Sequence, residues 1–179
     1  MTRTLINPVQ KDTITFLHKA EETGYLYTEI DVDLQPGGGT PPHTHKTYSE
    51  IFRVLQGELT IYAGGEKYVL HPGTEIEAKA GVVHRFANES KKAVRFKVLV
   101  KPGHTGFENA LYILYGLAAD GLTNKKGVPK NLTHLAIVNE ISEMNLAGPL
   151  KIMQPYLRYL ARKASRAGED RKLIEKYCG

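Results

Sequence analysis

The chain has 179 residues, of which 41% are hydrophobic, and a formal net charge of +5 at pH 7. This length predicts one domain with room for an additional element, and the apolar content is enough to build a core. No stretch approaches the about 18 consecutive apolar residues that a membrane-spanning helix needs. We therefore expect a globular protein without a transmembrane segment.

The first hundred residues alternate between apolar and polar side chains in short runs, which is typical of strands that bury one face. The clearest run spans residues 26–34, and others follow at 59–63 and 94–100. Turn residues interrupt these runs at Pro36-Gly37 and Pro102-Gly103. Short strands at such regular spacing predict a β-sandwich or a β-barrel.

Three histidines and one glutamate in this region have a spacing that suits metal coordination. His43 and His45 share one face of a strand because successive side chains alternate. Glu50 follows at the start of the next strand, and His84 begins a later one. Three imidazoles and one carboxylate suit divalent iron, nickel, copper, zinc or manganese. The sequence therefore predicts one transition-metal ion bound by His43, His45, Glu50 and His84.

Strand alternation also predicts the walls of this site. Phe52 and Val54 share a face with Glu50, Phe86 shares a face with His84, and Ile61 lies on or near the inward register. Apolar walls around a metal with an open position suit a small organic ligand that coordinates through its oxygens.

Other ionisable residues near the motif are not predicted to be catalytic. Tyr48 and Arg85 flank the predicted ligands, and we expect both at the surface, with Arg85 pointing outward. His18, His71, His104 and His134 lie outside the motif and are interpreted as ordinary surface or loop residues.

These residues form two motifs that resemble those of the cupin superfamily. The first motif contains Gly37, His43, His45, Glu50 and Gly57. The second contains Gly73, Gly81, His84 and Asn88, with Lys79 where the family has a proline. The resemblance implies a mainly β fold, a double-stranded β-helix (jelly-roll) barrel with a metal at the four predicted ligands.

After Gly103 the apolar period lengthens to about 3.6 residues, which predicts helices. The run from Thr105 to Glu108 fits a capping box for a helix over 106–119. Further helices are predicted over 132–143 and from Gly148 onward. Residues 1–103 should form the barrel, and residues 104–179 should form an α-helical C-terminal extension.

The last predicted helix is basic and amphipathic. Its apolar face should contain Ile152, Met153, Tyr156, Leu157, Leu160 and Ala164, and its opposite face Lys151, Arg158, Arg162 and Arg166. Such a helix either lies on an anionic membrane surface or packs by its apolar face against protein. We expect the second arrangement, on the outer surface of the barrel or on a partner subunit in a homodimer.

Two functions agree with these observations. The first is a metal-dependent enzyme, an oxygenase or isomerase, that acts on a small oxygen-rich organic molecule. The second is a non-catalytic cupin that binds a small ligand or acts as a sensor. The shortage of acid–base residues counts against an isomerase more than against an oxygenase, and the absence of a DNA-binding motif counts against a regulator.

Charge and cysteine content narrow the expected partners and location. The excess of basic residues after Leu150 equals the whole net charge, so residues 1–149 are neutral on balance and predict no nucleic-acid partner. The chain has a single cysteine and no apolar signal segment at its start, which favours a cytoplasmic protein.

Overall fold

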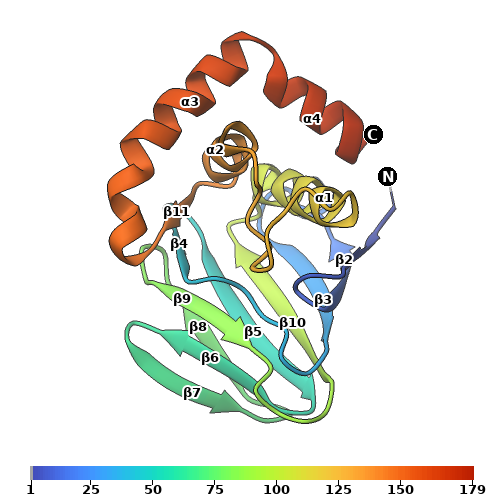
Figure 1. Cartoon of the computed structure of the whole chain (residues 1–179). Helices are drawn as coiled ribbons and strands as arrows, with labels where there is room; N and C mark the ends of the chain where they lie inside the picture. The colour runs from blue at the N-terminus through green and yellow to red at the C-terminus, as the bar shows by residue number, and fades with distance from the viewer. Residues whose placement is uncertain (1) are drawn as a thin grey trace.

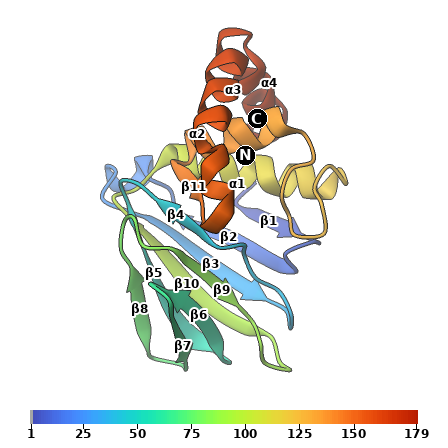
Figure 2. The same cartoon turned by 60° about the vertical axis from the view of Figure 1, so that its left-hand side comes forward.

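The computed structural model describes residues 2–179, apart from the side chains of Pro149 and Leu150; Met1, the first residue of the predicted barrel, lies outside this part. Two antiparallel sheets face each other and enclose the core (Figures 1 and 2). In spatial order, the larger sheet contains β1 (Thr4–Asn7), β2 (Asp12–His18), β3 (Thr28–Leu34), β10 (Val94–Lys101), β5 (Ser49–Gln56) and β8 (Glu75–Ala78). The smaller sheet contains β11 (Met144–Leu146), β4 (His43–His45), β9 (His84–Ala87), β6 (Leu59–Ala63) and β7 (Glu66–Leu70).

The barrel core follows from strand alternation. On β3 the side chains of Ile30, Val32 and Leu34 are buried, as the sequence predicts. In the register of the larger sheet, Val98 on β10 lies opposite both Ile30 and Phe52. These apolar side chains stack across neighbouring strands, and their removal from water is the main stabilising contribution to the barrel.

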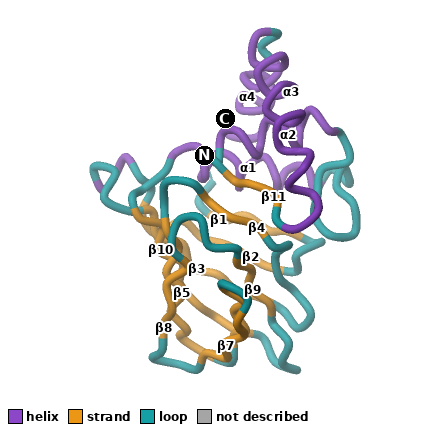
Figure 3. Tube along the Cα trace, turned by 90° about the vertical axis from the view of Figure 1, so that its left-hand side faces the viewer, coloured by secondary structure: helices purple, strands orange, loops and turns teal. Residues whose placement is uncertain are grey.

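The helices gather at one end of the barrel (Figure 3). They are α1 (Thr105–Ala119), α2 (Leu132–Ile141), α3 (Gln154–Arg166) and α4 (Glu169–Cys178), with short 3-10 turns at Glu21–Thr23 and Gly148–Met153. The predicted fold class, a jelly-roll barrel followed by a helical extension, is confirmed. Of the helices that the structure describes, none is both long and apolar enough to cross a membrane.

The extension also contributes a strand, which the sequence analysis did not predict. Helix α2 ends at Ile141, two residues before the expected end, and Glu143 takes a positive φ of 54°. The chain then forms β11, in which Met144 lies opposite His45 on β4. This pairing satisfies backbone groups that the edge of β4 would otherwise expose.

The capping box predicted at the start of α1 is wrong. His104 is the N-cap residue, and its Nδ1 accepts a hydrogen bond from the Phe107 backbone N–H at 2.9 Å. The Glu108 carboxylate instead accepts from the Ala20 N–H and the Thr28 hydroxyl, both at 2.6 Å. These buried hydrogen bonds attach α1 to the barrel at β3. In a capping box the Glu108 carboxylate would instead accept from a backbone N–H of its own helix.

The predicted apolar face of the last long helix is only partly buried. Leu157 and Ala164 on α3 are buried, but Ile152 is 86% exposed and Tyr156 is also exposed. Arg158, expected on the solvent side, is half-buried and donates to the Asn145 side chain at 3.4 Å. The buried face of α3 is therefore rotated relative to the apolar face that the sequence predicts. This face is narrow because α3 packs on another helix, α2, and not on a broad sheet surface.

Candidate metal centre

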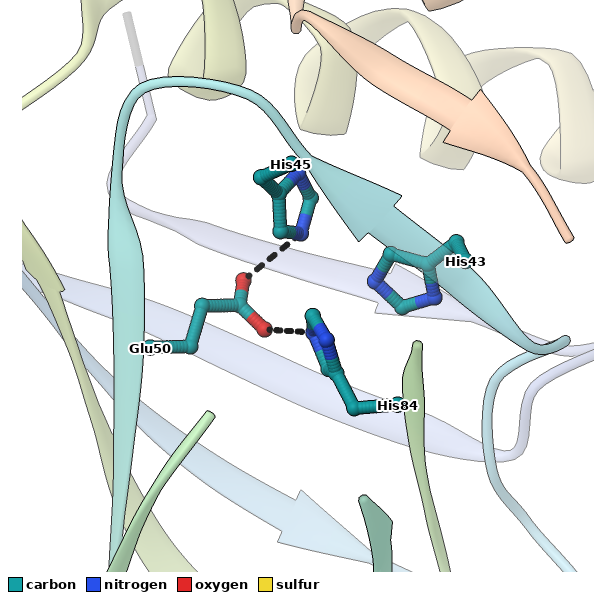
Figure 4. A group of neighbouring side chains, drawn as sticks. All are labelled: His43, His45, Glu50 and His84. Carbon is teal, nitrogen blue, oxygen red and sulfur yellow. Dashed lines mark hydrogen bonds and ion pairs between the residues drawn. The ribbon is translucent and has the colours of Figure 1, made fainter. Parts of the chain in front are cut away.

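Three strands bring the four predicted ligands together. His43 and His45 lie on β4, Glu50 on β5 and His84 on β9, and their side chains point toward one another (Figure 4). One ligand atom from each residue lies within 4.8 Å of the others. The register places His43 directly opposite His84, so the shared face expected from alternation is present.

A glycine-dependent contact sets this register. Gly39 has a φ of 153°, and a Cβ built there would lie 2.5 Å from the Phe86 carbonyl oxygen. The next residue, Thr40, donates its backbone N–H to the same carbonyl at 3.1 Å. The loop before β4 therefore lies directly against β9, which only glycine permits at this position.

The backbone determines which ring nitrogen faces the centre. Nδ1 of His43 lies 2.8 Å from the Pro41 carbonyl, and Nδ1 of His84 lies 2.9 Å from the Val82 carbonyl. A carbonyl oxygen only accepts, so each Nδ1 carries the proton and donates. In the neutral ring Nε2 then keeps a lone pair for a metal, an arrangement typical of metal-binding histidines.

Glu50 supplies a negative charge between two of these rings. Its Oε2 lies 3.0 Å from Nε2 of His84, and its Oε1 lies 3.5 Å from Nε2 of His45. Burial opposes ionisation of Glu50, but attraction to His45 and the contact with His84 bring its pKa down to about 2. The carboxylate is therefore ionised at neutral pH.

His45 and His84 are buried and His43 is half-buried, and their environments differ. Burial lowers the pKa of His45 to about 3 and also lowers the pKa of His43. Burial acts on His84 in the same direction, but the contact with Glu50 raises its pKa above the ordinary value. Neither ring nitrogen of His45 has a hydrogen-bond partner within the described chain. Unpartnered buried nitrogens beside a carboxylate fit a divalent transition metal, which would use the lone pairs that the protein leaves unsatisfied.

Tyr48 and His104 belong to the surroundings of the centre. The expectation that Tyr48 lies at the surface is wrong, whereas His104 lies in a loop, as expected. Tyr48 is 1% exposed, stacks on His45 at 4.3 Å between ring centroids, and donates to the Ser142 carbonyl at 2.8 Å. The ring of His104 lies 5.0 Å from Tyr48. Tyr48 precedes Glu50 by two residues, so strand alternation points both side chains to the same face. This alternation could have predicted that Tyr48 points inward.

A cavity of about 140 Å³ adjoins the centre, and His43, His45 and Glu50 form part of its wall. Of the four wall residues predicted from alternation, Phe52 and Phe86 line the cavity. Val54 and Ile61 are buried in the barrel core and do not line it. Val54 faces inward as expected, but it lies two residues farther along β5 from the metal centre than Phe52 does.

The extension forms the opposite wall of this cavity. Phe107, Leu111 and Leu114 on α1, Val138 on α2 and Met144 on β11 all line it. The sequence analysis missed these residues because it placed the helices on the outer surface of the barrel or on a partner subunit. The two predicted halves of the chain therefore share one cavity.

Arg85 points away from the centre, as alternation predicts. Its guanidinium carbon lies 4.0 Å from the centroid of the Tyr62 ring. Tyr62 in turn donates to Glu89 at 2.7 Å, in an exposed cluster on the outer side of β6 and β9.

Comparisons with known proteins agree with this geometry. Residues 30–101 match a family model described as a cupin domain. Over 94 residues the chain is 32% identical to germin-like protein subfamily 1 member 4 of Arabidopsis thaliana, a match that covers 48% of this chain and 42% of that protein. Over 83 residues it is 31% identical to epoxidase atD of Aspergillus terreus, covering 46% of this chain and 26% of that protein.

The matched region spans less than half the length of these curated relatives. Among solved structures, KdgF from Halomonas sp. is similar with a TM-score of 0.47 and 21% identity, over 51% of this chain and 79% of that one. The family match covers the strands that carry all four residues of the candidate centre. Residues 30–101 of this chain therefore form a cupin domain.

Proposed function

We propose that this protein is a metal-dependent enzyme, an oxygenase or an isomerase, acting on a small oxygen-rich organic molecule. The observation that carries the proposal is a convergent cluster of three imidazoles and one carboxylate that opens into a mostly apolar cavity. Such a combination orients a small ligand by its polar end and excludes bulk water from the rest.

His43, His45, Glu50 and His84 would hold one divalent transition metal, with iron, manganese, nickel, zinc and copper all suited to the donor set. When bound, the metal would supply Lewis-acid or redox chemistry at the polar end of the cavity. The carbonyls of Pro41 and Val82 keep two of the rings in the ligating tautomer. Glu50 would offset part of the metal charge, and Phe52 and Phe86 would keep water away.

The distribution of ionisable groups favours an oxygenase over an isomerase. Among the described residues that line the cavity, the ionisable side chains outside the cluster are Asp12 and Tyr115, which contact each other about two helical turns along α1 from the metal centre. An isomerase needs a positioned acid or base beside the reacting carbon, whereas an oxygenase relies on its metal. The match to a protein named as an epoxidase also supports oxidative chemistry.

The test starts with elemental analysis of the purified protein. We expect about one transition-metal ion per chain, and a loss of more than tenfold in metal content for His45→Ala. His71→Ala, which changes an exposed histidine outside the motif, is the matched control. Equal metal content in wild type and His45→Ala would overturn the metal assignment.

Oxygen uptake then separates the two reactions. The metal-loaded protein is assayed against catechols, flavonols, β-diketones and thiol acids. Oxygen consumption coupled to product identifies an oxygenase, and conversion without oxygen identifies an isomerase. Saturable binding without turnover identifies the alternative, a non-catalytic ligand-binding cupin.

A further inference from the structure

We propose that the end of the cavity at Asp12 and Tyr115 is a second polar binding site, which accepts a hydrogen bond from a hydroxyl or protonated amine of the ligand. The inference rests on the proposed function in one respect, that this cavity is where the ligand binds. It adds the ligand's class: an elongated molecule with an apolar middle, an oxygen-bearing end at the metal centre and a donor group at the other end.

The first argument is an unsatisfied acceptor. Asp12 is buried at the start of β2, and its side chain lines the cavity. Its Oδ2 accepts a hydrogen bond from the Tyr115 hydroxyl at 2.8 Å, but its Oδ1 has no partner among the described residues. Leaving a buried acceptor unpaired is costly, and native proteins rarely do so without a functional reason.

The second argument is the distance between the two polar ends. Phe107, on the first turn of α1, lies 6.3 Å from His45 between ring centroids, whereas Tyr115 on the same helix contacts Asp12. Eight residues of α-helix span about 12 Å along the axis. Leu111 and Leu114 line the wall between them, so the middle of a bound ligand meets apolar surface.

The third argument is the chemistry of the groups at and near this end. Burial raises the pKa of Asp12 to about 6, so at neutral pH most molecules hold a carboxylate here. A ligand hydroxyl or ammonium would satisfy Oδ1 and favour the ionised form. On α2, Asn139 also lines the cavity, and its buried Nδ2 is a donor without a partner in residues 2–179. An acceptor atom on the same ligand would satisfy it.

The experiment measures binding of three probes of one shape to the full-length protein by calorimetry. The probes are propylbenzene, 2-phenylethanol and 2-phenylethylamine, which have the same number of non-hydrogen atoms and differ only in the last group of the side chain. Their size suits the site, because an engineered cavity of about 150 Å³ holds benzene. The readout is the affinity of each polar probe relative to that of propylbenzene.

The test variant is the double substitution Asp12→Leu with Tyr115→Phe. Replacing both partners of a buried hydrogen bond by apolar groups is nearly neutral for stability, and thermal unfolding checks that the fold is retained. The control is Tyr112→Phe, on the same helix as Tyr115. It removes a hydroxyl that donates to the Thr2 carbonyl, and Tyr112 does not line the cavity.

We expect the preference for the polar probes to fall by about tenfold or more in the double variant and to stay unchanged in the control. An unchanged preference in the double variant overturns the inference, as does the absence of binding by all three probes. Metal analysis of the same samples separates the two proposals: a metal-loaded protein with no dependence on Asp12 keeps the proposed function and loses this one. If the preference falls in the double variant but the protein binds no metal, the second binding site is supported and the proposed metal-dependent function is overturned.

Discussion

The two ends of the cavity are built from different kinds of sequence information. The metal end uses residues of the cupin domain, and the spacing of His43, His45 and Glu50 reflects strand alternation and the short loop between two strands. The other end joins Asp12 to Tyr115, which are 103 residues apart. At the metal end one anion lies among three imidazoles, whereas at the far end one carboxylate has a single neutral donor.

The comparison shows how burial acts on two carboxyl groups in one cavity. Burial opposes the ionisation of both, yet the pKa of Glu50 falls to about 2 while that of Asp12 rises to about 6. The difference lies in the neighbours, because attraction to three histidines stabilises the Glu50 anion, whereas Asp12 has only uncharged hydrogen-bond donors. The metal end therefore offers an ionised carboxylate and imidazole nitrogens to a cation. At the far end, Oδ1 of Asp12 lacks a hydrogen-bond partner that a ligand would supply.

The largest expected effect is at the metal end. In wild type, excess metal at about 1,000 times its dissociation constant should stabilise the fold by about 4 kcal/mol relative to chelator-treated protein. Glu50→Gln removes the anionic ligand, so this stabilisation should fall to near zero. Chemical denaturation with and without metal measures it, and Glu66→Gln on exposed β7 is the control. A metal-dependent stabilisation equal to wild type in Glu50→Gln would contradict the assignment of Glu50.

The next effect is at the far end and depends on pH. The folded state raises the pKa of Asp12 from 3.8 to about 6, so folding favours the protonated form. The resulting penalty is absent below about pH 4, grows as pH rises, and is complete above about pH 6, where it amounts to roughly 3 kcal/mol. Asp12→Asn should therefore be more stable than wild type at pH 7 by up to that amount.

Denaturation of Asp12→Asn between pH 3.5 and 8 tests this prediction. The gain over wild type should disappear at the acidic end of the range. Asp33→Asn, which changes an exposed aspartate on the neighbouring strand, is the control. A loss of stability in Asp12→Asn at pH 7 would mean that the carboxylate is fully satisfied without a ligand.

The smallest effect concerns the link between the metal end and the extension. Tyr48→Phe removes the hydrogen bond to the Ser142 carbonyl and keeps the ring that stacks on His45. We expect a loss of about 1 kcal/mol in the free energy of unfolding and unchanged metal content. Tyr62→Phe removes an exposed hydroxyl contact and should cost less than about 0.5 kcal/mol. Equal losses in the two variants would show that the buried hydrogen bond adds nothing.

Much of the barrel and of the metal centre was predictable because the relevant information is local. Side chains alternate along a strand whatever lies around it, so the inward positions at His43, His45, Glu50 and Phe52 follow from counting residues. The predictions failed where a distant partner decides the outcome. Glu108 fits a capping box, yet it bonds to the barrel at Thr28.

The sequence by itself determined the fold class, the register of the four candidate metal ligands and the helical character of residues after Gly103, because each depends on a short-range periodicity. Only the tertiary structure decided that α1 and α2 close the cavity, that β11 extends the sheet beside His45, and which face of α3 is buried. These features depend on which surfaces meet. An amphipathic helix has an apolar face wherever it packs, and its own sequence does not specify which surface that face covers.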